Sequence, residues 1–380
     1  MDHKKKFYLF KQSKRFCSVP WNYFKIDTDG TVRTCVQGRT TLGNINQQPI
    51  KEILKNPLLT QIKKDLYNDV PNINCTRCHT FEQESNNYKF LRQLYNEYFV
   101  KVDVDYSDPD AFTLSGVDLH WDSTCNLKCV TCWAKQSSAI AQEMRIPIYS
   151  TAEKDVTELN DWIISQQHTL REIYLSGGEP TLIKKNLRLL ESLDKKNDFL
   201  LRVNTNLTFS RENKIIQEIL KFPNVSITVS ADALNNRFEY IRNGAKWDQF
   251  ISNMDWLTQT HAQLRVNSVF FVASASGLIE TQDFFRQKYN IKDFTVNQCS
   301  MEQYSLMSRN LPTEVKQVVQ DKFQKAIEVH ADNTNLVGQL TNCIKELQHN
   351  KNEYSYTEYF NDIDRRRGTN WQSVFPELIV

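Results

Sequence analysis

The sequence lacks the features that would place it in a membrane or on a polyanion. No stretch approaches the roughly 20 apolar residues of a membrane-spanning helix, and the apolar part of the basic start is too short for a signal peptide. Lys and Arg (47) nearly balance Asp and Glu (45), which leaves a net charge of +2, so overall charge predicts no nucleic-acid partner. There is no internal repeat and no low-complexity segment. We therefore expect a cytoplasmic globular protein.

Cysteine is present in two groups. In a reducing compartment, grouped thiols are more often metal-binding or catalytic than disulfide-bonded. The first group is Cys17, Cys35, Cys75 and Cys78, the second is Cys125, Cys129 and Cys132, and the isolated ones are Cys299 and Cys343. The grouping predicts two metal sites, one with four ligands and one with three.

Strand and helix patterns alternate from residue 112 onward. Strands are predicted over 112–121, 171–178, 199–208, 224–233, 264–274 and 293–300. Helices are predicted over 134–145, 153–167, 184–196, 211–221, 236–259 and 278–288. Such alternation implies parallel strands with right-handed crossovers, and six units are too few for a complete eight-fold barrel. The prediction is an α/β fold with a partial (β/α)6 barrel.

The unusual residues follow the carboxyl ends of the predicted strands. The three cysteines follow the first strand, and "SGGEP" (176–180) ends the second. Asn204 and Asn206 end the third strand, and Ser230 and Asp232 end the fourth. Because parallel strands end at one rim, these residues are expected to converge, although turn and capping roles are open for the asparagines, Ser230 and Asp232.

The spacing C-x3-C-x2-C lacks the fourth thiolate of a closed metal site. An iron–sulfur cube on three cysteines leaves one iron without a protein ligand, and an open position is typical of a site that performs chemistry. An amino acid group could chelate that iron through its amine and carboxylate. Half of a zinc site, or three buried thiols, are the alternatives.

The segment 177–180 suits such an amino acid ligand. Gly177 and Gly178 allow close backbone approach, Glu179 could accept hydrogen bonds from an ammonium group, and Pro180 turns the chain out of the strand. By itself this sequence would be only a strand-to-helix turn, so its weight comes from the pairing with the three cysteines.

Residues 115–300 resemble the radical S-adenosylmethionine (radical SAM) superfamily, through "CNLKCVTC" and the later "GGEP". The resemblance implies a 4Fe–4S cluster on Cys125, Cys129 and Cys132, with S-adenosylmethionine on its unique iron. Reductive cleavage of that cofactor would form a 5′-deoxyadenosyl radical that takes hydrogen from a substrate. Asn206 and Ser230 stand where relatives contact the cofactor. An electron donor such as flavodoxin or ferredoxin is also implied.

The four N-terminal cysteines form a second pattern. A hairpin signal around Asp29-Gly30 separates Cys17 from Cys35, and Cys75 and Cys78 form a C-x2-C pair. Four thiolates suit zinc or an iron–sulfur cluster on ligand type alone.

The surrounding motifs resemble the SPASM/Twitch module, with Glu82 and Ser85 at matching positions. This resemblance favours an auxiliary 4Fe–4S cluster over zinc. The chain differs from most relatives of this kind in that its SPASM/Twitch-like module precedes the barrel instead of following it.

The predicted organisation is a four-cysteine module over 1–100, the radical SAM partial barrel over 112–300, and a helical extension over 301–380. The extension contains a short basic stretch around residues 365–367, which we interpret as a solvated turn. The substrate is not determined by the sequence. A peptide is the leading expectation by analogy, with a nucleotide, base or small metabolite as alternative. A non-catalytic iron–sulfur or zinc scaffold is the alternative from another class. Asp232 could alternatively be a substrate-facing acid. His120 is interpreted as a histidine of the core rather than a ligand, and Cys299 as a buried structural thiol.

Overall fold

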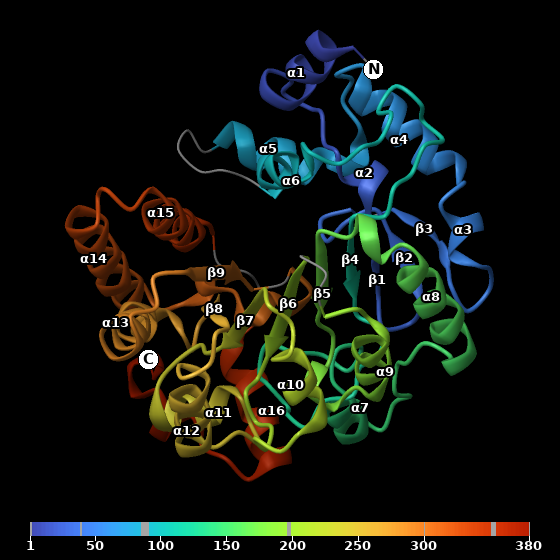
Figure 1. The fold of residues 1–380 in the computed structure, drawn as a ribbon. Helices are drawn as coiled ribbons and strands as arrows, with labels where there is room; N and C mark the ends of the chain where they lie inside the picture. Colours follow the sequence, from blue (N-terminus) through green and yellow to red (C-terminus); the bar gives the residue numbers. More distant parts are fainter. Residues whose placement is uncertain are drawn as a thin grey trace. The chain divides into compact units, whose positions relative to one another are not determined.

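The computed structural model of the protein contains two compact units (Figure 1). The described residues are 2–38, 40–84, 91–195, 199–299, 301–350 and 355–379. The first unit comprises Met1–Cys125, Ala134–Asn204 and Arg211–Ser226, and the second comprises Asn126–Trp133, Thr205–Ser210 and Ile227–Val380. Within the described ranges, no helix is both long enough and apolar enough to cross a bilayer.

The first unit is built on a mixed sheet with the strand order β3-β2-β1-β4-β5-β6. The strands are β1 (Tyr23–Ile26), β2 (Thr31–Arg33), β3 (Thr41–Asn44), β4 (Gly116–Leu119), β5 (Glu172–Leu175) and β6 (Leu200–Thr205). Pairing is antiparallel for β1–β2 and β2–β3. It is parallel for β1–β4, β4–β5 and β5–β6. The predicted α/β class with parallel barrel strands is confirmed here.

The predicted hairpin is confirmed as β1 and β2, which turn at Gly30. This glycine has a φ of +82°, and a Cβ there would stand 2.5 Å from Asn46 Nδ2, so a side chain is excluded both by backbone conformation and by space. The hairpin also joins the sheet of the barrel strands, because Tyr23 of β1 pairs with Gly116 of β4. The proposed domain boundaries at 100, 112 and 300 stay a prediction.

Helices of the first unit precede the hairpin, follow it and connect the parallel strands. They are α1 (His3–Lys11), α2 (Val19–Asn22), α3 (Ile50–Ile53), α4 (Pro57–Tyr67), α5 (Thr76–Glu84), α6 (Leu91–Phe99), α7 (Ser138–Met144), α8 (Glu153–Ser165), α9 (Lys184–Ser192) and α10 (Lys214–Ile219). Short 3-10 turns lie at Ile73–Cys75, Gln167–Thr169 and Pro180–Leu182.

The two faces of the first unit's sheet differ in polarity. On one face, apolar side chains such as Phe24, Val117 and Ile173 are fully buried, and the Phe24 ring stacks on Trp162 of α8 at 5.9 Å. On the other face, one row in register across four strands consists of Lys25, Asp118, Tyr174 and Arg202. Because successive side chains of a strand alternate between faces, α8 packs on the apolar face and the polar residues share the opposite one, where Tyr23 of β1 packs on Tyr95 of α6 at 5.4 Å.

The second unit continues the strand–helix alternation. Its strands are β7 (Val225–Ser230), β8 (Gln263–Phe270) and β9 (Phe294–Gln298), where β7 neighbours β8 and β8 pairs in parallel with β9. Its helices are α11 (Asn235–Ile241), α12 (Trp247–Leu257), α13 (Leu278–Tyr289), α14 (Thr313–Val329), α15 (Thr334–Gln348), α16 (Tyr356–Arg367) and α17 (Trp371–Val374). Short 3-10 turns lie at Ala275–Gly277, Met301–Leu306, Ser308–Asn310 and Pro376–Leu378. The later helices share one apolar core with the end of β8, where Phe270 packs on Phe323 of α14 at 5.5 Å.

Two sequence predictions in the second unit are corrected by the structure. The single helix predicted over 236–259 is two helices, α11 and α12, because Gly244 has a φ of +103°. A Cβ at that glycine would lie 3.2 Å from Leu127 Cδ2, so the break makes room for the loop that contains the cysteines. The basic stretch 365–367 is solvated as predicted, with Arg365 and Arg366 exposed, but it is the last turn of helix α16, capped by Gly368 with a φ of +66°, rather than a turn outside a helix.

Helix α4 buries a lysine in the core of the first unit. The Lys63 ammonium donates a hydrogen bond to the Ala111 carbonyl at 2.8 Å and lies 5.9 Å from the centre of the Trp21 ring. Burial lowers the pKa of Lys63 to about 8, while the carboxylates of Asp110 and Asp108 act in the opposite direction. The charged form is therefore disfavoured in the folded protein.

We expect this lysine to make stability depend on pH in the alkaline range. Between about pH 8 and pH 10.5, the unfolded chain keeps a proton on this side chain that the folded chain has released, so the free energy of unfolding rises with pH. Denaturant unfolding of Lys63→Met should lack this rise, whereas Lys64→Met, on the exposed side of the same helix, should keep it. An unchanged pH dependence in Lys63→Met would contradict the assignment.

Candidate metal centres

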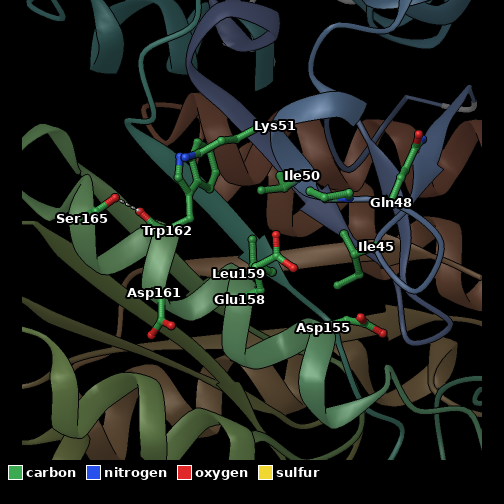
Figure 2. A pocket seen from close by; sticks show the side chains of 11 residues that line it. Ile45, Gln48, Ile50, Lys51, Asp155, Glu158, Leu159, Asp161, Trp162 and Ser165 are labelled. Atoms are coloured by element: carbon green, nitrogen blue, oxygen red, sulfur yellow. Dashed lines mark hydrogen bonds between the residues drawn. The ribbon is translucent and has the colours of Figure 1, made fainter.

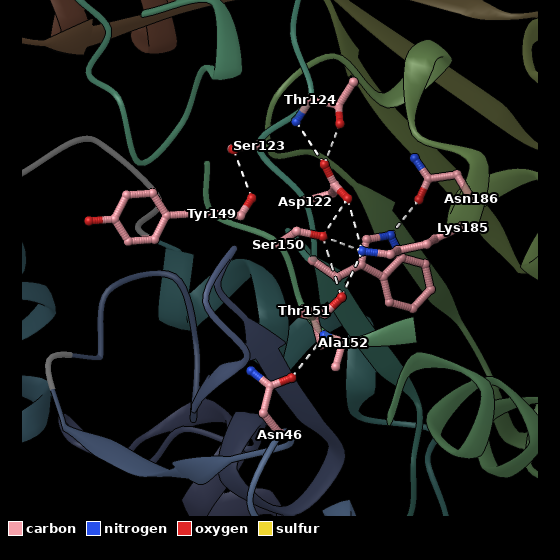
Figure 3. Close-up of polar contacts among 11 residues, drawn as sticks. Asn46, Asp122, Ser123, Thr124, Tyr149, Ser150, Thr151, Ala152, Lys185 and Asn186 are labelled. Carbon is pink, nitrogen blue, oxygen red and sulfur yellow. Dashed lines mark hydrogen bonds and ion pairs between the residues drawn. The ribbon is translucent and has the colours of Figure 1, made fainter. Parts of the chain in front are cut away.

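The loop that contains Cys125 is anchored where it leaves β4. The carboxylate of Asp122 accepts hydrogen bonds from the Thr124 amide at 2.8 Å, from the Ser150 hydroxyl at 2.8 Å and from the Lys185 ammonium at 2.9 Å (Figure 3). Burial alone would raise the pKa of Asp122, but the bonds from Lys185 and Thr124 outweigh it and the pKa is lowered. The loop therefore starts from a buried, charged anchor between β4 and α9.

Neighbouring bonds fix the same loop from both sides. Lys185 also donates to the Thr151 carbonyl at 2.8 Å, and the Ser123 hydroxyl donates to the Tyr149 carbonyl at 2.7 Å (Figure 3). The Cys125 amide donates to the Ser138 hydroxyl at 3.0 Å, at the start of α7. These contacts hold the backbone of Cys125 in one position.

The segment Ser176–Pro180 lies directly against this loop. The amide of Gly178 donates to the Asp122 carbonyl at 3.1 Å, and the Glu179 amide donates to the Thr124 carbonyl at 2.7 Å. A Cβ on Gly178 would stand 2.2 Å from the Thr124 carbonyl oxygen. Gly177 has a φ of +110°. The two glycines are thus required by close backbone contact with the cysteine loop.

Glu179 has a local role in the structure. Its side chain is buried, at 1% exposure, and the carboxylate accepts hydrogen bonds from the Thr181 amide at 3.2 Å and the Thr181 hydroxyl at 2.7 Å. It caps the 3-10 turn that begins at Pro180. The predicted contact of Glu179 with an ammonium group stays a prediction.

Cys129 and Cys132 belong to the second unit, where Cys129 faces a buried ion pair. Arg242 Nη1 lies 3.9 Å from Cys129 Sγ, and Arg242 Nη2 lies 2.8 Å from Asp232 Oδ2. Burial raises the pKa of the Cys129 thiol, and the Arg242 guanidinium opposes this rise. The sequence did not single out Arg242, because nothing in its neighbourhood marks it as close to residue 129.

The strand-end residues of the second unit are held differently. Asn206 donates to Asn126 Oδ1 at 3.1 Å and accepts from the Thr208 amide at 3.0 Å, so it braces the residue that follows Cys125 in sequence. Ser230 is buried at the end of β7. Asp232 pairs with Arg242 and accepts from the Val269 amide at 2.7 Å. Binding of a cofactor by Asn206 and Ser230 stays a prediction.

The four N-terminal cysteines form one group of neighbouring free thiols. Burial raises the pKa of Cys17 well above its usual value, and the thiols of Cys75, Cys35 and Cys78 raise it further. Burial, followed by Cys35 and Cys78, raises the pKa of Cys75 to about 12. The four sulfur atoms therefore lie within electrostatic reach of one another, although 58 residues separate the first from the third in sequence.

This group has two features that favour negative charge on sulfur. The Gly38 amide donates to Cys35 Sγ at 3.2 Å. Burial raises the pKa values of Cys75 and Cys78 to about 12, and the Arg92 guanidinium opposes this rise. Arg92 also forms a two-pronged ion pair with Glu82, at 2.8 and 2.6 Å. Glu82, which the sequence resemblance singled out, thus orients a cation beside the thiols, while Ser85 lies outside the described residues.

The remaining observations on metal ligands concern single-ion sites and the two isolated cysteines. In the described ranges, no three His, Cys, Asp or Glu side chains are close enough together to hold a single metal ion. Cys299 and Cys343 are buried in the second unit. Cys343 Sγ accepts from the Gln298 side-chain amide at 3.6 Å, and Cys299 Sγ donates to Gln303 Oε1 at 3.6 Å, while Gln303 Nε2 donates to the Cys132 carbonyl at 3.4 Å.

The polar face of the first unit's sheet contains His120, which the sequence indicated as a core histidine, together with Asp118 and Asn204. Nε2 of His120 lies 3.1 Å from Asp118 Oδ1, and the Ser176 hydroxyl donates to the same oxygen at 2.9 Å. Asp118 Oδ2, His120 Nδ1 and Asn204 Oδ1 are buried without a hydrogen-bond partner among the described residues. Their signal in the sequence is the alternation of polar with apolar residues along the strands.

A separate pocket of about 320 Å³ lies in the first unit between the segment after β3 and α8 (Figure 2). Ile45 and Ile50 line it from the segment after β3, and Leu159 and Trp162 line it from α8. Its lining residues include none of the cysteines, so it is not connected with the metal centres.

Family models match both parts of the chain that contain grouped cysteines. Residues 123–269 match the model of the radical SAM superfamily, and residues 17–79 match that of an iron–sulfur cluster-binding domain, SPASM. The chain carries a radical SAM domain and a SPASM domain. Members of this superfamily are enzymes, and the two domains imply a 4Fe–4S cluster, an auxiliary cluster and S-adenosylmethionine as cofactors. The family resemblance of the sequence is thereby confirmed.

Solved structures similar to this chain share little sequence with it. Native anSMEcpe with bound AdoMet is 16% identical, covers 58% of this chain and 62% of its own, and has a TM-score of 0.45. SuiB of Streptococcus suis bound to S-adenosylmethionine is 15% identical, covers 83% and 71%, and has a TM-score of 0.44. The chain thus spans less than two thirds of the first neighbour's length. TM-scores of 0.45 and 0.44 do not support a functional inference. The search of curated proteins found no match.

The contact between Gly178 and the cysteine loop generates a prediction. In Gly178→Ala, the new Cβ meets the backbone of Thr124 at 2.2 Å, so the loop must shift and the radical SAM cluster should be lost. Anaerobically reconstituted protein should then contain about half the iron of wild type, since one of two equal cubes is missing.

The matched control is Gly277→Ala, because a Cβ at Gly277 meets nothing within 4 Å. It should keep the full iron content. Equal iron in the two variants would show that the segment 177–180 does not position the cysteine loop.

Proposed function

We propose that the protein reductively cleaves S-adenosylmethionine at a 4Fe–4S cluster held by Cys125, Cys129 and Cys132, and that the resulting 5′-deoxyadenosyl radical abstracts hydrogen from a substrate. The observation that carries this proposal is the bonding of the Gly178 and Glu179 amides to the cysteine loop, at 3.1 and 2.7 Å. Both halves of the sequence motif are thereby joined at one edge of the sheet. A turn sequence unrelated to the cysteine loop would not be expected to form these two backbone hydrogen bonds with it.

The chain's own residues would hold and orient the reactants. The cluster, when bound, supplies the electron that cleaves the cofactor. Asp122 and Lys185 fix the start of the cysteine loop, and Asn206 and Ser230 are proposed to contact the cofactor. The electron would come from a donor such as flavodoxin or ferredoxin. A chain with nine cysteines, most of them grouped as ligands rather than paired in disulfides, fits the reducing cytoplasm.

The SPASM domain is proposed to hold one auxiliary 4Fe–4S cluster on Cys17, Cys35, Cys75 and Cys78. The fit rests on the donor set, because four partly buried thiols influence one another's pKa values. Buried thiols with raised pKa values stay protonated unless a metal stabilises the thiolates. Full ligation by four cysteines suits electron transfer or structural support. Zinc is the alternative on ligand type.

The polar face of the sheet is the proposed side for the substrate. Asp118 and His120 stand directly before the cysteine loop and offer atoms without a hydrogen-bond partner among the described residues, which favours a substrate with polar groups. A peptide is the leading candidate by analogy with SPASM relatives, and a nucleotide, base or small metabolite is the alternative. A non-catalytic metal-binding scaffold would form no 5′-deoxyadenosine at all.

Mutation of the three cysteines tests the reaction. Wild-type protein, reconstituted anaerobically and reduced with dithionite, should contain about eight irons per chain and form 5′-deoxyadenosine from S-adenosylmethionine. Replacement of Cys125, Cys129 and Cys132 by alanine should leave about four irons and abolish this product. Chromatographic assay of 5′-deoxyadenosine decides the matter, and product formation by the triple variant would refute the assigned site.

Mutation of the N-terminal pair tests the auxiliary cluster. Cys75→Ala with Cys78→Ala should lose about half the iron and should unfold at lower temperature, because the cluster ties ligands that are far apart in sequence. Cleavage of S-adenosylmethionine should persist, since its ligands lie on another loop. Cys343→Ala, which removes an isolated buried thiol, is the control and should keep all iron. Full iron and stability in the double variant would exclude a metal site there.

A further inference from the structure

Arg242 is brought to the cysteine loop by backbone pairing inside the second unit. The Lys128 amide donates to the Asn243 carbonyl at 2.9 Å, and the Val130 amide donates to the Ile241 carbonyl at 2.8 Å. The segment after α11 therefore runs alongside the loop, with Arg242 opposite Cys129. This pairing fixes the backbone positions of both residues independently of any side-chain contact.

The guanidinium of Arg242 is held between a sulfur and a carboxylate. Nη1 lies 3.9 Å from Cys129 Sγ, and Nη2 lies 2.8 Å from Asp232 Oδ2. Exposure of the two charged side chains is 9% and 0%. Asp232 is itself fixed by the Val269 amide at 2.7 Å. The arginine therefore cannot turn toward solvent without leaving a buried carboxylate unpaired, which is costly.

A fixed cation beside a cluster ligand acts on the redox equilibrium. A guanidinium keeps its charge at any working pH. Reduction adds one negative charge to the cluster and its thiolates, and in a buried site a nearby positive charge favours the more negative state. Asp232 carries the opposite charge, but the guanidinium is the group that contacts the sulfur, with Nη1 of Arg242 at 3.9 Å from Cys129 Sγ and Nη2 turned to Asp232.

We propose that Arg242, oriented by Asp232, is a positioning residue that raises the reduction potential of the radical SAM cluster. The proposal rests on the proposed function, because Cys129 must be a cluster ligand. One electron passes from a low-potential donor, dithionite in the test below, to the oxidised cluster. No bond forms or breaks in this step, and the donor is oxidised by the one electron that the cluster gains.

The test is an EPR-monitored redox titration of the full, anaerobically reconstituted protein in the absence of substrate. Arg242→Gln should lower the equilibrium constant for one-electron reduction at least tenfold, which is a shift of about 59 mV to lower potential. Arg237→Gln is the matched control. It removes the same charge from α11, where Arg237 pairs with Glu377 at 2.8 Å, and should leave the potential unchanged.

A second variant protects the test against a folding defect. Arg242→Lys keeps the charge but cannot bridge sulfur and carboxylate with a planar fork, so its equilibrium constant should fall about threefold. An unchanged potential in whichever variant retains the cluster would overturn the proposal, as would an equal shift in Arg237→Gln. Failure of the proposed function would appear separately, as a wild-type protein that binds no cluster at the three cysteines.

Discussion

The buried ion pair between Asp122 and Lys185 is the contact on which the site depends most. It connects the end of β4 to the start of α9 at 2.9 Å, and the same carboxylate binds the amide that precedes Cys125. The two carboxylate oxygens of Asp122 accept hydrogen bonds from the Thr124 amide, the Lys185 ammonium and the Ser150 hydroxyl. These bonds together offset the free-energy cost of burying the charge. The glycines at 177 and 178 can then pack against a loop of fixed shape.

Buried cations recur beside the thiol groups of both domains. Arg92, oriented by Glu82, lies near the N-terminal cysteines, and Arg242, oriented by Asp232, lies near Cys129. In each case a carboxylate binds one side of the guanidinium. The other side of Arg92 donates to the Phe16 carbonyl at 2.7 Å, whereas Nη1 of Arg242 faces Cys129 Sγ at 3.9 Å. This arrangement lets a thiolate-rich centre exist in an interior that would otherwise disfavour negative charge.

The two faces of the first unit's sheet differ in function: one packs apolar side chains, and the other carries a row of polar side chains. Apolar side chains of alternate residues pack on the helices, while Lys25, Asp118, Tyr174 and Arg202 share the opposite face in register. The parallel pairing of β1 with β4 brings Lys25 from the hairpin into this row. The hairpin of the SPASM domain thus contributes Lys25 to the polar face of the sheet, next to Asp118 of the strand that leads into the radical SAM cysteine loop.

Much of this protein was determined by local sequence. The cysteine spacing, the "GGEP" turn, the Asp29-Gly30 hairpin and the strand–helix alternation depend on neighbouring residues, and the fold class and family followed from them. The prediction of a single helix over 236–259 was wrong because the chain breaks at Gly244, where it packs against Leu127, more than 100 residues away in sequence. No local pattern contains that contact.

Only the tertiary structure decided which charges meet which sulfurs. Arg242 and Arg92 are ordinary arginines in the sequence, and their roles arise from backbone pairing and helix packing across long separations. His120 and Asp118 likewise gain significance from strand register, which sets every residue of one face side by side. Spacing along the chain specifies ligands that share a loop, whereas partners on separate elements are specified by packing of the whole unit.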